Sequence, residues 1–216
     1  MKNNKLVKAI PTQTAQRIYD FIGKRYDWFS SYDAHAKERA FELLAVTPGQ
    51  YLLEVGVGTG KENARIHSAI LPGGISFGID ISRVMLTLTR QKNETPLCQA
   101  DVRDIPFVSD CFDRVFISYV LDLLPITDIP DILAGLQRVL KPGGRIVIIA
   151  LTEGISRSSR MLVAVWKAVY KISPITCAGC RPLQLSQLVE KAGLIHVRRE
   201  VVVQLAVPSE ILVATK

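Results

Sequence analysis

The segment at residues 52–60, Leu-Leu-Glu-Val-Gly-Val-Gly-Thr-Gly, constrains the fold more than any other part of this chain. An apolar run with the composition of a buried strand ends here, and three glycines follow at alternate positions, Gly56, Gly58 and Gly60. Glycine adopts positive φ without steric cost and has no Cβ, so such a turn lets a ligand approach the backbone closely. A dinucleotide-binding fingerprint needs its third glycine three residues after the second, but that position is Lys61. The segment therefore predicts a nucleotide-like ligand held by a loop that differs from the dinucleotide pattern.

The remainder of the chain alternates short apolar strands with helices, which is typical of an α/β sheet covered on both faces. Residues 12–46 are expected to be mainly helical, with an aromatic-rich first half. The patterning predicts five strands and the helices between them, with strands near 51–56, 75–80, 96–100, 113–118 and 145–151, and helices near 60–70, 82–92 and 128–140.

The C-terminal part shows a different pattern. A helix near 183–192 is followed by two apolar strands, 195–203 and 210–215, joined at Pro208-Ser209. So short a connection requires an antiparallel pair, because parallel strands need a long crossover. The predicted fold is thus a Rossmann-like, mostly parallel sheet of seven strands, with an antiparallel terminal strand and helices on both faces.

Length and composition indicate one globular domain spanning residues 1–216. No uninterrupted apolar run approaches the roughly 20 residues that span a bilayer, and no apolar segment follows the basic residues at the N-terminus to form a secretory signal. The four cysteines are expected to be reduced thiols, consistent with a cytoplasmic protein. For Cys177-Ala-Gly-Cys180 the metal or redox interpretation is disfavoured, because Cys98 and Cys111 do not form a second half-site. No metal is therefore expected.

Side chains suited to holding a nucleoside follow the first four predicted strands. Ligands of open α/β sheets bind outside the carboxyl ends of the strands. Asp80 ends the second strand and can accept hydrogen bonds from both ribose hydroxyls; alternatively, it only neighbours a helix N-cap. Asp101 and Val102 follow the third strand, where a carboxylate and a backbone N–H suit an adenine; alternatively, Asp101 is a loop acid. Ser118 and Tyr119 follow the fourth strand. Their joint occurrence at successive strand ends favours the binding interpretation.

Residues 48–151 resemble a class I S-adenosylmethionine (SAM)-dependent methyltransferase. The resemblance depends on five segments, at 53–60, 78–82, 100–107, 112–115 and 138–145. It implies SAM as the cofactor, and the antiparallel terminal hairpin also fits the family. Within it, the chain is most similar to the group of ubiquinone/menaquinone biosynthesis methyltransferases and bacterial phosphatidylethanolamine N-methyltransferases, on the segments Tyr26–Asp33 and Pro208–Ala214. The implied reaction is methyl transfer to a small, hydrophobic or lipid-like acceptor.

The resemblance assigns expected roles to individual residues. Glu54 is expected to orient the methionine amino group of SAM or to brace the glycine loop. The expected cofactor-binding residues are Glu54, Gly56, Gly58, Gly60, Asp80, Ile81, Asp101, Val102 and Ser118. No residue is singled out as the catalytic base, and the candidates are Asp122, Tyr119 and His35. The helical segment 1–47 is expected to form a lid on the acceptor side.

The basic residues cluster in one segment. The chain has 27 Lys and Arg against 20 Asp and Glu, a net charge of +7, and no acidic residue lies between Glu153 and Glu190. Four cations of this segment fall within an arc of roughly 80° on a helix: Arg157, Arg160, Lys167 and Lys171. Such a stripe can contact a membrane surface, which would place the protein peripherally at the inner membrane, or it can be a solvated helix face.

Two other functions remain open. A pI of about 9.3 suits an RNA methyltransferase, but no Asn-Pro-Pro-Tyr-type motif follows the fourth strand, so nucleic acid is the less favoured partner. A non-catalytic SAM-binding protein is the third interpretation, and it is disfavoured because the glycine loop and both strand-end carboxylates are intact.

Overall fold

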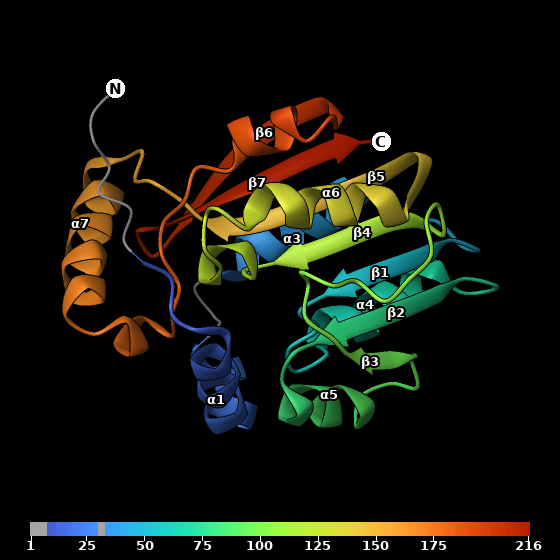
Figure 1. The fold of residues 1–216 in the computed structure, drawn as a ribbon, viewed down its shortest axis with the longest axis horizontal. Coiled ribbons are helices and arrows are strands. Elements are labelled where there is room, and N and C mark those ends of the chain that lie inside the picture. Colours follow the sequence, from blue (N-terminus) through green and yellow to red (C-terminus); the bar gives the residue numbers. More distant parts are fainter. Residues whose placement is uncertain (1–7, 30–32) are drawn as a thin grey trace.

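The computed structural model describes residues 8–29 and 33–216. The two ranges outside it are 1–7 and 30–32; the second lies inside the Tyr26–Asp33 segment of the predicted lid. Seven strands form one sheet in the order β3-β2-β1-β4-β5-β7-β6 (Figure 1). The strands are β1 (Tyr51–Val55), β2 (Ile75–Asp80), β3 (Leu97–Gln99), β4 (Phe112–Ser118), β5 (Leu140–Leu151), β6 (Ile195–Gln204) and β7 (Val207–Thr215).

The predicted fold class is confirmed. Strands β1 to β5 pair in parallel, and β7 runs antiparallel to both of its neighbours, β5 and β6. The helices connecting or covering the strands are α1 (Thr12–Ile22), α2 (Tyr26–Phe29), α3 (Ala34–Leu44), α4 (Lys61–Ile70), α5 (Arg83–Arg90), α6 (Ile129–Val139), α7 (Arg157–Ile172) and α8 (Ser186–Lys191). Short 3₁₀ turns complete the chain, namely η1 (Gly23–Arg25), η3 (Leu121–Leu123) and η4 (Pro174–Cys177).

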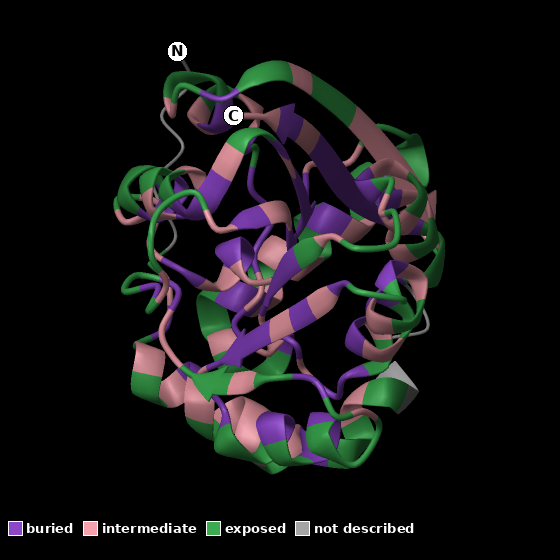
Figure 2. Ribbon diagram, turned by 90° about the vertical axis from the view of Figure 1, so that its right-hand side faces the viewer, coloured by how far each residue is buried: buried purple, intermediate pink, exposed green. Residues whose placement is uncertain are grey.

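Both faces of the central strands are buried, so consecutive strand residues belong to different cores. Leu53 and Val55 of β1 pack in one core with residues of α6 and α8. Leu52 of the same strand packs in the other core, with residues of α3 and α4. This alternation follows from the period of two in a strand, and it explains the near-continuous apolar strand sequences. Figure 2 shows the buried residues concentrated along the strands and on the inward faces of the helices.

The C-terminal hairpin differs from the prediction. Pro208 and Ser209 are not the connection; they lie within β7, paired with Val203 and Val202. The turn is instead Leu205-Ala206, where both residues have positive φ, 50° and 65°. Two-residue hairpin turns of this type match the right-handed twist of the strands. Sequence reasoning placed the turn at the proline because proline usually interrupts a strand.

The N-terminal helices separate into two parts. Helix α3 packs on the sheet against β5, β6 and β7, whereas α1 contacts α5 near the carboxyl ends of the parallel strands. The predicted lid of residues 1–47 therefore comprises a sheet-covering helix as well as a segment above the strand ends. Within the described ranges, no helix is long and apolar enough to cross a membrane.

Candidate functional site

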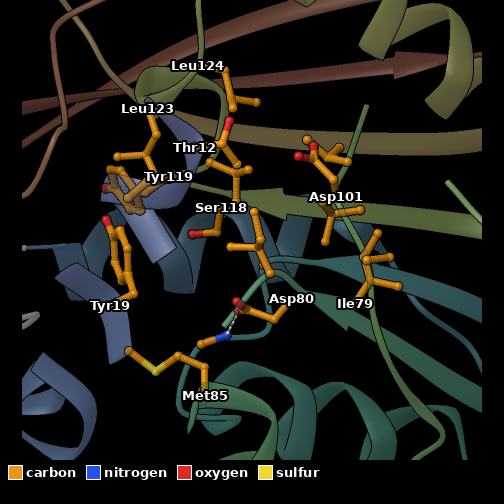
Figure 3. Close-up of a pocket in the computed structure, with 18 of the residues that line it drawn as sticks. Thr12, Tyr19, Ile79, Asp80, Met85, Asp101, Ser118, Tyr119, Leu123 and Leu124 are labelled. Atoms are coloured by element: carbon orange, nitrogen blue, oxygen red, sulfur yellow. Dashed lines mark hydrogen bonds between the residues drawn. The ribbon is translucent and has the colours of Figure 1, made fainter. Parts of the chain in front are cut away.

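A pocket with about 820 Å³ of empty space, open solvent included, lies at the carboxyl ends of β1, β2 and β4 (Figure 3). Loop residues after the strands form one wall, and α1 with η3 forms the other. The pocket is lined by Ile10, Thr12, Ala15, Tyr19, Tyr26, Val55, Gly56, Gly58, Ile79, Asp80, Ile81, Met85, Ala100, Asp101, Val102, Ser118, Tyr119, Val120, Leu123 and Leu124.

The glycine turn between β1 and α4 forms the floor of this pocket. All three glycines have positive φ, but their surroundings differ. A Cβ on Gly58 would meet no atom within 4 Å, so its backbone faces open space. A Cβ on Gly60 would lie 2.7 Å from Thr89 Cα, and Gly60 does not line the pocket. The structure therefore places the open Gly58 backbone where a ligand can approach. Gly56 also lines the pocket, but a Cβ there would lie 2.3 Å from Val120 Cγ2, and Gly60 lies where the turn packs against Thr89 of α5.

Asp80 ends β2 with its carboxylate at the pocket. Its two oxygens accept hydrogen bonds from the backbone N–H of Gly58, at 2.9 Å, and of Ser82, at 2.8 Å; the first is drawn in Figure 3. Burial raises the pKa of Asp80 to about 6, against the opposing effect of these N–H donors. Each carboxylate oxygen can accept a further hydrogen bond. Asp80 thus joins the glycine turn to the second strand and remains able to accept bonds from a ligand.

Asp101 follows β3 and is half-buried at the pocket edge, next to Val102. Arg103 holds the Asp101 carboxylate with its guanidinium, Nε to Oδ1 at 3.0 Å and Nη2 to Oδ2 at 2.5 Å. Burial raises the pKa of Asp101, but the Arg103 hydrogen bonds outweigh it and hold the pKa below its usual value. Asp101 is therefore a fixed carboxylate, and Arg103 is a partner that sequence reasoning missed.

Ser118 and Tyr119 follow β4, as expected, and both line the pocket. Among the described residues, the buried Ser118 hydroxyl has no hydrogen-bond partner. Tyr119 has a positive φ of 53°, and its hydroxyl lies 2.6 Å from Ser209 Oγ on β7. An unpaired buried hydroxyl is costly in a folded protein, so the Ser118 side chain marks a position where a ligand can supply the missing bond.

Glu54 lies away from the pocket lining. It is buried within β1 on the face covered by α3 and α4, and its Oε2 has no hydrogen-bond partner in the described part of the chain. Burial is the main cause that raises the pKa of Glu54 to about 8, and the nearby Glu62 carboxylate adds to it. This position suits bracing of the glycine loop from behind.

Two of the three candidate catalytic residues do not reach the pocket. Asp122 is fully buried in η3; its Oδ2 accepts from Leu151 N at 3.2 Å, and burial raises its pKa to about 7. His35 is exposed on α3, where its backbone N–H donates to Gln204 Oε1 at 2.8 Å. Of the candidates, only Tyr119 lines the pocket.

The N-terminal helices contribute pocket residues that no strand-end pattern indicates. Tyr19 and Tyr26 line the pocket from α1 and α2, and the Tyr19 hydroxyl lies 3.7 Å from Cys180 Sγ. Figure 3 shows Tyr19 and Tyr119 together at one side of the pocket, with Asp101 and Ile79 at the other. The aromatic-rich composition of the N-terminal segment was the available signal. Among the described residues, no group of three or more His, Cys, Asp or Glu side chains could hold a metal ion, either at the Cys177–Cys180 pair or elsewhere.

Three polar contacts attach this N-terminal segment to the pocket loops. Thr59 of the glycine turn donates to Asp27 at 2.6 Å, and Ser82 after β2 donates to Asp20 at 2.5 Å. Arg103 after β3 donates to Thr12 at 2.5 Å. Each of the first three strand-end loops therefore has a hydrogen bond to the helices above it, and these helices cover the pocket.

Residues 53–148 match a family model described as a methyltransferase domain. Demethylmenaquinone methyltransferases of Staphylococcus aureus are 30% identical over 165 residues, which cover 71% of this chain and 65% of the relative. The chain thus spans slightly less than two thirds of the length of these relatives.

Solved structures show the same fold at low sequence identity. A SAM-dependent methyltransferase of Thermotoga maritima, described as a possible histamine N-methyltransferase, superposes with a TM-score of 0.71 at 16% identity, over 93% of this chain and 99% of that one. Phosphoethanolamine N-methyltransferase 2 of Haemonchus contortus, solved with S-adenosyl-L-methionine, gives 0.68 at 17% identity, over 92% of this chain and 60% of that one.

Proposed function

We propose that this chain, as a class I SAM-dependent methyltransferase, transfers a methyl group from SAM to a hydrophobic, lipid-like acceptor. The observation that carries this proposal is the joint geometry of the open Gly58 backbone and the buried Asp80 carboxylate. These two groups lie at adjacent strand ends and are joined by a hydrogen bond, so one nucleoside-containing ligand can contact both.

The residues present fit SAM. Asp80 supplies a carboxylate for the ribose hydroxyls, and the open side of Gly58 leaves room beside the backbone for the amino-acid part. The apolar walls between Asp80 and Asp101 suit an adenine, with Ile81 and Val102 among them. The unpaired Ser118 hydroxyl supports the presence of a further polar group. When bound, SAM supplies a methyl group that the adjacent sulfonium already activates.

The protein's contribution to this reaction is positioning and exclusion of water. Methyl transfer requires the acceptor atom to line up with the methyl group. The protein accelerates this step mainly by holding the two reactants close together in the correct orientation. Tyr119, Leu123 and Leu124 approach the pocket from the end of β4 and from η3, and Tyr19 faces them from α1. A base is needed only where the acceptor must lose a proton. Of the three candidates, Tyr119 is the one that we propose as this base, because it lines the pocket.

The apolar acceptor side supports a quinone-like or other lipid-like substrate. Ile10, Leu123 and Leu124 line this part of the pocket, and none of them offers a charge to a polar metabolite. The S. aureus relatives are named for methylating demethylmenaquinone, whose ring and apolar tail suit such a wall. The acceptor class is thus proposed from the lining chemistry and from this relationship together.

We also propose that α1 and α2 form the lid of this site. Their residues line the pocket, and Thr12, Asp20 and Asp27 bond to the three loops below. Opening of these contacts would widen the path by which a nucleoside-sized ligand enters and leaves. The lid therefore covers bound SAM and keeps water from the methyl group, whereas α3 belongs to the sheet.

Incubation with methyl-labelled SAM and separate lipid, small-molecule and RNA fractions of a cell extract tests the proposal. Label is expected in the lipid fraction and is expected to disappear in an Asp80→Ala variant. Label in RNA alone would replace the proposed acceptor by the nucleic-acid alternative. SAM binding without turnover on any fraction would favour the non-catalytic interpretation.

A further inference from the structure

The outward face of α7 carries large apolar side chains that the protein leaves in water. The exposed fractions of Met161, Val165 and Ile172 are 70%, 56% and 86%. At about 100° per residue, the three lie within an arc of roughly 40°. Ile155 and Ile175, just before and after the helix, are also exposed, at 51% and 61%. Isolated exposed apolar residues are normal, but a contiguous group marks an interaction surface.

A row of unpaired cations lies directly beside this apolar row. Arg157, Arg160 and Lys171 are exposed and fall within an adjacent arc of roughly 60°. No described carboxylate forms an ion pair with any of the three. Lys167 of the same helix differs, because it pairs with Glu153 at 2.5 Å. The outward face thus combines an apolar row with three uncompensated positive charges.

The opposite face of α7 is already anchored to the protein. Val163 and Tyr170 are buried, and Trp166 Nε1 donates to the Cys180 carbonyl at 2.9 Å. The helix begins with a capping box between Ser156 and Ser159, so its first turn is fixed. The exposed apolar row therefore does not take part in packing α7 against the rest of the protein, and the contacts of the opposite face fix the orientation of the helix.

We propose that this face of α7 docks on an anionic lipid surface. An amphipathic helix lying in a membrane interface buries its apolar row below the headgroups, while neighbouring Lys and Arg contact lipid phosphates. The net charge of +7 adds long-range attraction to such a surface. RNA would satisfy the cations and leave the apolar row in water. A two-fold symmetric second copy would bring the same cations of both chains together.

The position of α7 connects this surface to the pocket. Figure 1 shows α7 at the left margin of the molecule, above and to the left of α1. Trp166 contacts Cys180, and the Cys180 thiol lies 3.7 Å from the hydroxyl of Tyr19, which lines the pocket. Docking through α7 therefore places the Tyr19 side of the pocket near the lipid, where an apolar acceptor would be dissolved.

Co-sedimentation with vesicles tests the proposal, using phosphatidylcholine alone and phosphatidylcholine mixed with phosphatidylglycerol. The wild type is expected to bind only the mixed vesicles. Exchanging three cations in Arg157→Gln/Arg160→Gln/Lys171→Gln should weaken partitioning roughly 100-fold, at about fivefold per charge. The charge-neutral change Val165→Ser/Ile172→Ser should weaken it by about tenfold or more. Both variants alter exposed side chains, so the fold should be retained.

A matched control removes apolar surface elsewhere. Val108 and Leu205 are 74% and 77% exposed and lie outside α7, and Val108→Ser/Leu205→Ser should bind vesicles as the wild type does. Absence of wild-type binding to the mixed vesicles would overturn the proposal, and so would equal losses in the control and the Val165/Ile172 variant. Self-association that disappears in the Val165/Ile172 variant, without vesicle binding, would assign the surface to a second copy. These measurements need neither SAM nor an acceptor, so their failure is distinct from failure of the proposed methyl transfer.

Discussion

Exchange of Asp80 for asparagine should weaken SAM binding while leaving the fold intact or more stable. The raised pKa of Asp80, about 6 against an ordinary 3.8, means that the ionised carboxylate is disfavoured in the folded state. The difference corresponds to about 3 kcal/mol of folding free energy at neutral pH. Asparagine has nearly the same shape and no charge, so Asp80→Asn removes this cost.

The loss of one hydrogen bond opposes the stability gained by removing the Asp80 charge. The two oxygens of Asp80 accept from Gly58 N and Ser82 N, and an amide must place its NH₂ group against one of these donors. A buried donor without an acceptor costs about 1–3 kcal/mol. The free energy of unfolding should therefore rise by about 0–2 kcal/mol, and a domain of this size gains up to about 8 °C in Tm.

The effect on SAM affinity should have the opposite sign. Hydrogen bonds to a charged acceptor contribute about 1.5–3 kcal/mol each, and the amide retains one acceptor oxygen of the two. A loss of about 2–4 kcal/mol corresponds to a roughly 30- to 1,000-fold weaker Kd. Titration calorimetry measures the affinity and thermal unfolding measures the stability. The control is Asp131→Asn, an exposed acid on α6.

The Asp80 carboxylate also makes the folding stability and the SAM affinity depend on pH. Because the pKa of Asp80 is raised on folding, its contribution to stability is present below about pH 4 and is lost as the pH rises through about 6. The stability difference between Asp80→Asn and the wild type should thus grow over this interval. SAM affinity of the wild type should fall below about pH 6, where Asp80 becomes protonated. Unchanged SAM affinity in the variant would refute the cofactor site, and a large loss of Tm would refute the electrostatic reasoning.

Three further outcomes follow from the pocket. Gly60→Ala should lower the free energy of unfolding by about 1–3 kcal/mol, because its Cβ would lie 2.7 Å from the Thr89 backbone. Gly58→Ala shares the strain of a positive φ but meets no atom, so it should lower the free energy of unfolding by less and weaken SAM binding more. Thermal unfolding and calorimetry on the same pair separate the two effects, and equal effects on both would contradict the assignment. Asp27→Ala removes a lid contact and should accelerate SAM dissociation measured by stopped flow, and an unchanged rate would argue against the lid. Cys180→Ala should leave SAM affinity unchanged, and a large loss would place the thiol in the cofactor site.

The positions of the strands and of their ends could be predicted from the sequence, because each strand is marked by a local residue pattern. The apolar runs of β1, β2 and β4 are long enough to be recognised, and the polar residue that ends each run lies at one edge of a parallel sheet by topology alone. The sequence alone could therefore bring Asp80, Asp101 and Ser118 to one pocket. The hairpin turn could not be placed correctly, because Leu205-Ala206 has no glycine or asparagine to indicate its positive φ.

Residues whose position depends on packing between distant segments could not be predicted. Tyr19 reaches the pocket only because α1 lies over the strand ends, and Asp122 in the short turn η3 is fully buried and does not line the pocket. The separate role of Gly60 likewise depends on how closely Thr89 of α5 approaches the glycine turn, which no spacing of glycines reveals.

By itself, the sequence determined the α/β sheet, the glycine turn and the carboxylates at successive strand ends. These follow from local periodicity and from the rule that parallel strands share one carboxyl edge. Only the tertiary structure decided which glycines face a ligand, which candidate residues enter the pocket, and that the cations of α7 lie beside an exposed apolar row. Those properties depend on how closely segments that are far apart in the chain approach one another and on which side chains they bury. A local residue pattern carries no information on these distances or on this burial.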